Sequence, residues 1–144
     1  MKILLLLATI FVSACASTPK LYNASNVEES QLAHLQAEKT SFFDSKFFGL
    51  LDSAYNEAGE KVIESDFWSG ASREARLEAG TYIFVFKCDN GSVYGFPKTK
   101  FTLEPAKSYI FSCVGHTEKG IFNIDFNKAV SIEIKEADSS FSGT

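Results

Sequence analysis

The segment TYIFVFKC, residues 81–88, places a large side chain at nearly every second position. Successive side chains of a β-strand point to opposite faces, so a period of two divides this segment into two faces. We therefore expect a strand that turns an aromatic face toward a core. That face holds Tyr82, Phe84, Phe86 and Cys88, and the opposite face holds Ile83, Val85 and Lys87.

The same alternation recurs later in the chain, in TKFTLEP (99–105), SYIFSCVG (108–115), IFNIDF (121–126) and VSIEIKE (130–136). The residues expected to face inward are Thr99, Phe101, Leu103, Tyr109, Phe111, Cys113, Val130, Ile132 and Ile134. Turn-forming residues lie at 56–60, 78–80, 89–92, 104–107 and 116–120. Among these, Asn90-Gly91 is the strongest signal, because both residues accept positive φ in a tight hairpin.

The earlier part of the chain predicts one strand near Leu32–Glu38 and another through Phe47–Tyr55. A short helix within Gln31–Lys39 competes with the first strand, because Ala, Gln and Glu favour helix. Short strands with turns about every ten residues are typical of an antiparallel sandwich or barrel. We therefore expect an all-β fold, a single antiparallel β-sandwich of about seven or eight strands.

The composition is consistent with this fold and excludes one class of partner. A chain of 144 residues with 45% apolar content suits one domain. Fourteen Phe and five Tyr favour pleated, half-buried surfaces. With 14 basic and 18 acidic residues the net charge is −4, which argues against binding of nucleic acid.

The amino terminus has the pattern of an export signal. Lys2 precedes ILLLLATIFV (3–12), a run too short to span a bilayer, which needs about 20 residues. The run matches the apolar region of a secretory signal. Val12-Ser13-Ala14-Cys15 resembles the bacterial lipobox, which implies diacylglycerol on Cys15, cleavage before it, and N-acylation, typically with palmitate. The alternative is an ordinary secretory signal that happens to contain a cysteine.

This resemblance predicts the organisation and the location of the chain. We expect a lipoprotein signal peptide (1–14), a lipidated cysteine with a flexible tether (15–30), the sandwich (31–136) and a disordered tail (137–144). More than one acyl chain gives stable membrane anchoring. Because Ala16 and Ser17 follow the cysteine and aspartate does not, the lipobox resemblance favours the outer membrane, with the domain facing the periplasm.

The remaining cysteines, Cys88 and Cys113, each continue the inward face of an expected strand. In an oxidising compartment they are expected to form a disulfide. Its loop of 26 residues, counted from Cys88 to Cys113 inclusive, corresponds to about 3.5 kcal/mol in the chain-entropy model. The alternative is a metal or redox site using Cys113 and His116, but a single pair with this spacing is weak evidence. We expect no metal and no cofactor.

We find no catalytic motif in the sequence. Only His34 and His116 are candidate bases at neutral pH, and neither lies in a recognisable motif. The segment WSGAS (68–72) lacks the Gly-x-Ser-x-Gly pattern of a nucleophile elbow. The acidic residues fall mostly at solvent-facing positions. We therefore expect a protein that is not an enzyme.

Clustered aromatic residues suggest either end-capping of the sandwich or a binding surface. SFFDSKFFG (41–49) contains Phe42, Phe43, Phe47 and Phe48, and DFWSG (66–70) adds Phe67 and Trp68. Neighbouring residues of a strand cannot both face one core, so some rings must cap an end, cover a second face or remain exposed. If these residues form a partner-binding surface, Phe67 and Trp68 are its expected anchors.

Two stretches resemble small bacterial β-sandwich lipoproteins of unknown function that are close to the PEGA type. They are LEAGTY (77–82) and FTLEPAKSY (101–109). This resemblance implies a prealbumin-like or immunoglobulin-like sandwich that serves as an envelope module without an activity of its own. The glycine that precedes lysine in that pattern is Ala106 here, which leaves the geometry of that turn open.

A second resemblance gives an alternative function. FKCDNGSVYG (86–95) is similar to a hairpin of membrane-bound periplasmic lysozyme inhibitors, but their inhibitory loop is not present, and WSGASRE (68–74) offers only a partial counterpart. We expect a membrane-anchored, non-catalytic envelope lipoprotein that binds an envelope protein or a cell-wall partner, or has a structural role. The alternative is an inhibitor that presents a protruding loop at 69–73.

Overall fold

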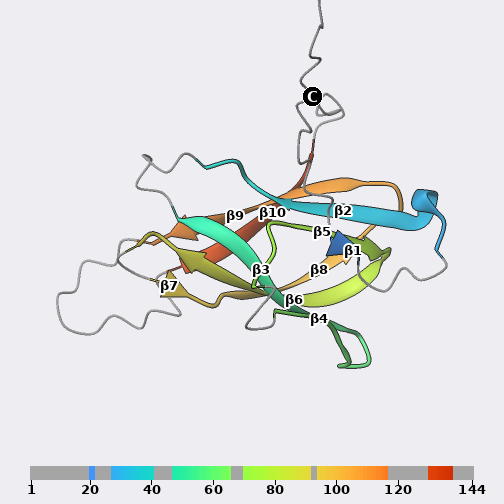
Figure 1. The fold of residues 1–144 in the computed structure, drawn as a ribbon, viewed down its shortest axis with the longest axis horizontal. Coiled ribbons are helices and arrows are strands. Elements are labelled where there is room, and N and C mark those ends of the chain that lie inside the picture. The colour runs from blue at the N-terminus through green and yellow to red at the C-terminus, as the bar shows by residue number, and fades with distance from the viewer. Residues whose placement is uncertain are drawn as a thin grey trace, which may run out of the picture.

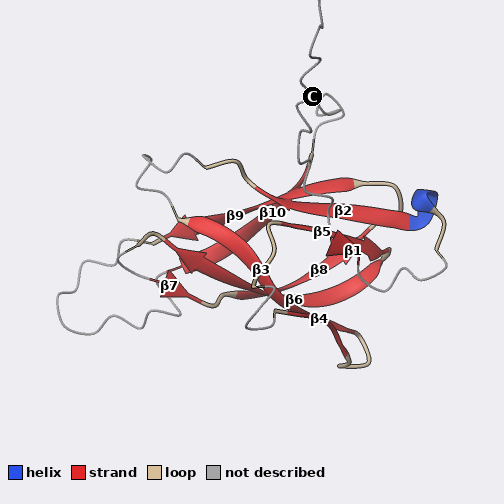
Figure 2. Cartoon of the chain, in the orientation of Figure 1, coloured by secondary structure: helices blue, strands red, loops and turns tan. Residues whose placement is uncertain are grey.

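The computed structural model describes residues 20–21, 27–40, 47–65, 70–91, 94–116 and 130–137. These residues form ten strands and one short 3₁₀ turn, η1 (Glu29–Gln31) (Figures 1 and 2). The first five strands are β1 (Lys20–Leu21), β2 (Leu32–Ala37), β3 (Phe48–Asn56), β4 (Lys61–Glu64) and β5 (Glu74–Glu78). The others are β6 (Gly80–Asp89), β7 (Tyr94–Gly95), β8 (Lys98–Leu103), β9 (Ser108–Gly115) and β10 (Val130–Glu136).

The strands form two sheets that pack face to face (Figure 1). The β2 sheet has the order β1-β5-β2-β9-β10, and the β6 sheet has the order β4-β3-β6, with β7 and β8 along the other side of β6. The described pairings are antiparallel except for β1–β5 and β2–β9. The all-β sandwich predicted from the sequence is confirmed, with eight strands of four or more residues and two of only two residues.

The aromatic face of β6 forms the centre of the core, as predicted. Phe84, Phe86 and Cys88 have no exposed surface, whereas Ile83 on the opposite face is 44% exposed. Phe86 packs against Phe111 of β9, with ring centroids 4.6 Å apart, and so joins the two sheets. The expected inward faces of β8, β9 and β10 are also confirmed, because Leu103, Tyr109, Phe111 and Val130 are buried. The segment 121–126 lies outside the described residues.

The two strands expected in the earlier part of the chain are confirmed as β2 and β3. The competing helix within residues 31–39 does not form, because 32–37 pair as the central strand of the β2 sheet and Leu35 is fully buried. Residues 16–30 were expected to be a flexible tether throughout. However, Lys20 and Leu21 pair in parallel with β5, and η1 begins at Glu29. Tertiary pairing therefore decides the structure at Lys20 and Leu21, which local composition does not predict.

Two tyrosine hydroxyls close the turns at which the chain passes between the sheets. The hydroxyl of Tyr82 donates to the carbonyl oxygen of Glu78 at 2.8 Å, across the β5–β6 connection. The hydroxyl of Tyr109 accepts from the backbone N–H of Glu104 at 3.0 Å, across the β8–β9 connection. This arrangement is similar to the tyrosine corner of β-sandwiches, in which a buried ring fixes a turn through its polar tip.

A disulfide between Cys88 of β6 and Cys113 of β9 joins the two sheets, as predicted, with the Cα atoms 5.9 Å apart. Gly49 of β3 pairs with Cys88 and leaves room for this bond. A Cβ atom at Gly49 would lie 3.1 Å from the Cys113 sulfur and 3.0 Å from the Phe111 ring. The absence of a side chain at Gly49 therefore allows this part of the core to close.

Three of the expected turns, at 56–60, 78–80 and 104–107, lie between consecutive strands as predicted. The expected turn at 116–120 extends beyond the described residues, and the tight hairpin at 89–92 is a wrong prediction. At 56–60 the chain turns with Gly59 at φ +80°, as the sequence indicates. A tight hairpin with positive φ at both Asn90 and Gly91 does not form. Only Gly91 has positive φ, +85°, and four residues separate the paired Asp89 and Tyr94. The Asp89 carboxylate accepts the N–H of Gly91 at 2.7 Å, which favours this wider loop.

The strands β7 and β8 continue one register along β6 with a break at Pro97. Gly95 pairs with Cys88 and Lys98 pairs with Val85, so the alignment is the same on both sides of the break. The carbonyl oxygen of Pro97 still accepts the N–H of Phe86 at 3.0 Å. Proline has no N–H to donate, so the ladder is incomplete at this position.

Removing the disulfide should lower the free energy of unfolding by about 3.5 kcal/mol, because the unfolded chain regains the freedom of a loop of 26 residues. The double variant Cys88→Ala/Cys113→Ala tests this by urea denaturation, with Cys15→Ser as a control that keeps the bond. An unfolding midpoint equal to that of the wild type would contradict this estimate.

Ala106 lies in the left-handed region with φ +59°, at the position where the family resemblance has glycine. The left-handed conformation costs a residue with a Cβ atom roughly 1–2 kcal/mol of free energy, whereas glycine adopts it without this cost. Ala106→Gly should therefore raise the free energy of unfolding by about 0.5–1 kcal/mol, after the larger unfolded-state entropy of glycine is subtracted. Ala79→Gly, at a turn whose φ is not positive, should lower it. Destabilisation by Ala106→Gly in thermal unfolding would refute this account of the turn.

Candidate functional site

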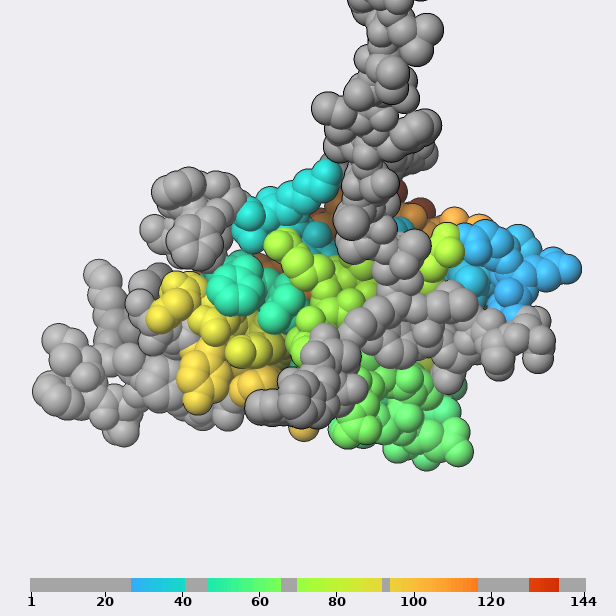
Figure 3. All heavy atoms as spheres, in the orientation of Figure 1, coloured from blue at the N-terminus to red at the C-terminus, as the bar shows by residue number. Residues whose placement is uncertain are grey.

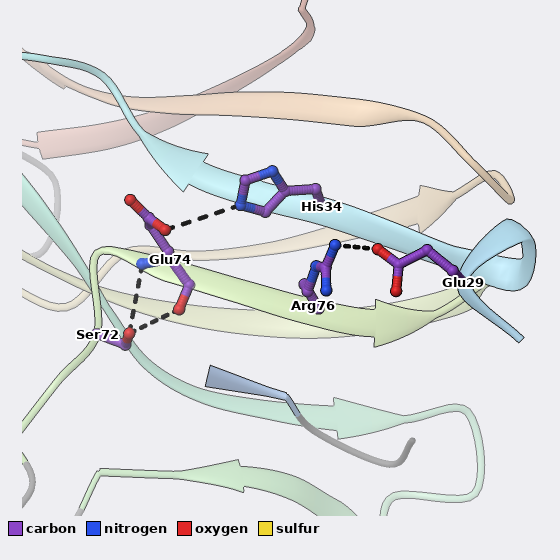
Figure 4. A network of polar contacts seen from close by, with 5 residues as sticks. All are labelled: Glu29, His34, Ser72, Glu74 and Arg76. Atoms are coloured by element: carbon purple, nitrogen blue, oxygen red, sulfur yellow. Dashed lines mark hydrogen bonds and ion pairs between the residues drawn. The ribbon is translucent and has the colours of Figure 1, made fainter. Parts of the chain in front are cut away.

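The outer face of the β2 sheet carries a row of polar side chains around His34. His34 lies on the central strand, opposite Arg76 of β5 on one side and Ser108 of β9 on the other. Figure 4 shows His34 pointing toward Glu74 and Arg76 pointing toward Glu29 of η1. The row is formed by strand alternation, because Ala33 and Leu35, the neighbours of His34, are fully buried on the inner face.

A pocket of about 360 Å³ lies at this row, with the η1 turn and the β8–β9 turn among its walls. Its polar lining includes Glu29, Ser30, His34, Arg76, Lys107 and Ser108. The volume lies within the usual range for small-molecule sites. The pocket is therefore the first candidate for a binding site, and its charges decide what it can do.

The basic groups of this pocket are already paired with carboxylates. Arg76 forms an ion pair with Glu29. The Lys107 ammonium lies 2.8 Å from a carboxylate oxygen of Glu104 and 3.1 Å from one of Glu136. These hydrogen bonds raise the pKa of Lys107 above its ordinary value. An entering anion would have to displace exposed glutamates, so these pairs are best explained as ties between η1, β5, the β8–β9 turn and β10.

The His34 ring is partly buried and imperfectly paired. Its Nε2 atom is buried without a hydrogen-bond partner and lies 3.9 Å from a Glu74 carboxylate oxygen. Burial lowers the pKa of His34, and the Arg76 charge lowers it further, against the opposing effect of Glu74. The ring is therefore held mostly in its neutral form.

The serines near the two histidines do not form a catalytic arrangement. The Ser72 hydroxyl donates to the backbone oxygen of Glu74 at 2.6 Å and accepts its N–H at 3.3 Å, so it serves a local turn (Figure 4). His116 and Ser131 form a hydrogen bond at 2.8 Å, but in an exposed position on the edge pair β9–β10. Within the described ranges, no three His, Cys, Asp or Glu side chains gather as metal ligands.

The outer face of the β6 sheet carries a different feature, which we call the aromatic patch. It consists of Phe48, Tyr94 and Phe96, which are 38%, 60% and 42% exposed, around Lys87 and Asp89. In the space-filling view, the teal start of β3 lies beside the yellow end of β6 (Figure 3). Tyr94 and Phe96 meet edge to face, with ring centroids 6.1 Å apart. A cluster of exposed rings on one face is typical of an interaction surface.

The structure places only some of the aromatic residues that the sequence singled out. A Cβ atom added to Gly115 would lie 2.7 Å from the Phe47 ring, so Phe47 packs over that end of β9, whereas Phe48 is exposed. This is the division expected for neighbouring strand positions. Phe42, Phe43, Phe67 and Trp68 lie outside the described residues, as does the predicted lipidation site Cys15.

Tyr94 and Phe96 were not among the residues singled out from the sequence, although a signal for their exposure is present. Lys100, Lys98, Phe96 and Tyr94 lie at alternate positions, so the two rings share the face that is opposite to Phe101. Parity along the strand therefore predicts that these rings are on the outer face.

The described part of the loop at 69–73 is held against two strands. Ser72 and Leu51 of β3 exchange backbone hydrogen bonds at 2.7 and 3.1 Å. The carbonyl oxygen of Arg73 accepts the N–H of Ala37 at 2.7 Å, and the Arg73 guanidinium donates to the backbone oxygen of Glu38. These bonds tie residues 72–73 to both sheets.

Comparisons with protein-family models, curated proteins and solved structures found no match for this chain. A search of the described residues found no helix long and apolar enough to cross a membrane.

The lowered pKa of His34 predicts a pH dependence of stability. The unfolded chain binds a proton at His34 more readily than the folded chain, so stability should fall as the pH drops from about 7 through the ordinary value near 6.5. His34→Gln should make this dependence weaker, because it removes the group whose pKa is lowered. Urea unfolding midpoints at pH 7 and pH 5 measure this pH dependence. An equal change in midpoint between the two pH values for the wild type and His34→Gln would contradict the prediction.

Proposed function

We propose that this protein is a lipid-anchored component of a bacterial envelope, on the outer membrane and facing the periplasm, whose sandwich is a non-catalytic binding module. The observation that carries the binding role is the aromatic patch. Three rings on one sheet face remain 38–60% exposed, although the inner face of that sheet already supplies a complete core. Exposed rings of this kind are useful for binding a partner.

Two features support the envelope location. The apolar run 3–12 ends at Cys15 in the lipobox-like sequence, and the Cys88–Cys113 bond suits an oxidising compartment. The short reach between Cys15 and β1 adds a geometric consequence. Five residue steps from Cys15 to Lys20 span at most about 17 Å, so the β1 edge of the β2 sheet would lie close to the lipid headgroups.

A binding role fits the polar groups better than catalysis does. The Ser72 hydroxyl is used by its own turn, and His34 contacts a carboxylate at 3.9 Å rather than a nucleophile. An active site needs a nucleophile and a base within hydrogen-bond reach, or an equivalent pair. The ion pairs around His34 are therefore assigned a structural role.

The alternative function, inhibition of a lysozyme by a loop at 69–73, has less support. Such a loop must project from the domain to enter a cleft, whereas residues 72–73 are hydrogen-bonded to β3 and β2. The hairpin of β6 and β7 is compatible with both proposed functions, so its presence does not favour the inhibitor.

Replacing the anchoring cysteine tests the proposed location. Cys15→Ser should move the protein from the membrane fraction to the soluble fraction of its host, because the sulfur that would carry the diacylglycerol is gone. The neighbouring variant Ser17→Ala is the control and should remain with the membranes. Cell fractionation and mass measurement of the mature protein give the readout. Equal membrane retention of both variants, or an unmodified Cys15 in the wild type, would refute the anchor.

A further inference from the structure

The aromatic patch forms a platform that extends over three neighbouring strands. Phe48 and Tyr94 are both paired with Asp89, which lies between them. At about 4.8 Å per strand, the outer two Cα atoms are about 10 Å apart. Phe96 follows Tyr94 by two residues on the same face. The platform is therefore wide enough for two linked sugar rings, with an aromatic side chain at each side.

The centre of the platform carries a donor and an acceptor whose charges cancel. The Lys87 ammonium lies 3.8 Å from a carboxylate oxygen of Asp89. This separation exceeds a hydrogen bond, so both groups retain capacity to bond a ligand. Because the pair has no net charge, the centre of the platform attracts neither anions nor cations overall. A neutral ligand with many hydroxyl groups can use both residues, since a hydroxyl both donates and accepts.

A pyranose ring has this combination of properties. Its two faces present C–H groups, and its hydroxyls project from the rim. The C–H groups pack on the electron-rich face of an aromatic ring, while the hydroxyls reach a nearby ammonium and carboxylate. Tyr94, the most exposed ring at 60%, also has a hydroxyl that can bond to the ligand.

We propose that the aromatic patch binds a neutral glycan chain. The choice of a glycan over a lipid surface rests on the proposed function, because it depends on the position of the anchored end. β1 pairs with β5 at Arg76. Across the β2 sheet, Arg76 is paired with His34 and His34 with Ser108, so these three residues lie at the same level along their strands. The patch borders Cys88, whose partner Cys113 is five residues beyond Ser108.

Five residues of strand span about 17 Å, and β1 and β7 lie well apart along the molecule in Figure 1. An anchor before β1 therefore leaves the patch away from the lipid headgroups, on the side that a cell-wall polymer can reach. This separation favours a glycan as the occupant over the bilayer.

Isothermal titration with the hexamer of β-1,4-linked N-acetylglucosamine tests the proposal on the full chain in detergent micelles. The wild type should bind, and Tyr94→Ala should bind at least roughly tenfold more weakly, as for the loss of a central aromatic anchor. Tyr94→Phe keeps the ring and should retain most of the affinity. Ile83→Ala is the matched control, because Ile83 is 44% exposed on the same face of β6 but lies outside the patch.

Thermal unfolding of each variant checks that the fold is intact, since Tyr94 contributes little to the core. No binding by the wild type, or equal losses for Tyr94→Ala and Ile83→Ala, would overturn the proposal. Patch-dependent binding to phosphatidylcholine vesicles instead of the hexamer would assign the patch to a membrane. Patch-dependent dimerisation in sedimentation, with no sugar binding, would assign it to a second copy. None of these outcomes depends on lipidation of Cys15. The fractionation experiment therefore tests the lipid anchor separately from the sugar titration, and either proposal can be refuted without the other.

Discussion

The position of the two sheets relative to each other depends on the bond between Cys88 and Cys113, together with the aromatic contacts that surround it. The bond joins β6, an inner strand of the β6 sheet, to β9, which lies next to the central strand β2 of the other sheet. The tilted rings of Phe86 and Phe111 pack together across the two sheets, and Gly49 leaves room for the Cys113 sulfur and the Phe111 ring. At the other end of these strands, the hydroxyls of Tyr82 and Tyr109 fix the turns between the sheets. The sandwich is thus closed covalently at one end and by hydrogen bonds at the other.

Because the inner faces are occupied by this core, the proposed binding role would have to use the outer faces, and the two outer faces carry different kinds of side chain. On the β2 sheet the charged groups have intramolecular partners, so the pocket beside His34 is tied into the surrounding turns. On the β6 sheet the rings of Tyr94 and Phe96 have each other but no covering layer among the described residues. The second face is therefore the one with unused capacity for contacts.

The architecture was accessible from the sequence because period-two alternation is a local signal with a direct structural meaning. Phe84, Phe86 and Phe111 show it clearly, and the disulfide followed from the parity of its cysteines. The pairing partners were not accessible, since nothing local indicates that β2 runs parallel to β9. The width of the loop after Asp89 depended on a side-chain hydrogen bond to Gly91, which competed with the tight turn that Asn-Gly favours.

The candidate sites were harder to predict than the fold. The density of aromatic residues in the sequence pointed to Phe67 and Trp68, which lie outside the described residues. Tyr94 and Phe96 were missed because exposure depends on strand parity across a loop and a proline. The pocket beside His34 combines residues from η1, three strands and a turn, and that combination exists only once the sheet order is known.

The lysines of β8 have a consequence for how copies of this protein would share a surface. Strands at the border of a sheet can recruit a border strand from a neighbouring molecule, and copies anchored to one membrane, as proposed, would meet often. Lys98 and Lys100 are exposed on β8, which lies at the border of the β6 sheet. Two such borders side by side would bring like charges together. Crowded copies would therefore remain separate along this side, and the rings next to it would stay accessible.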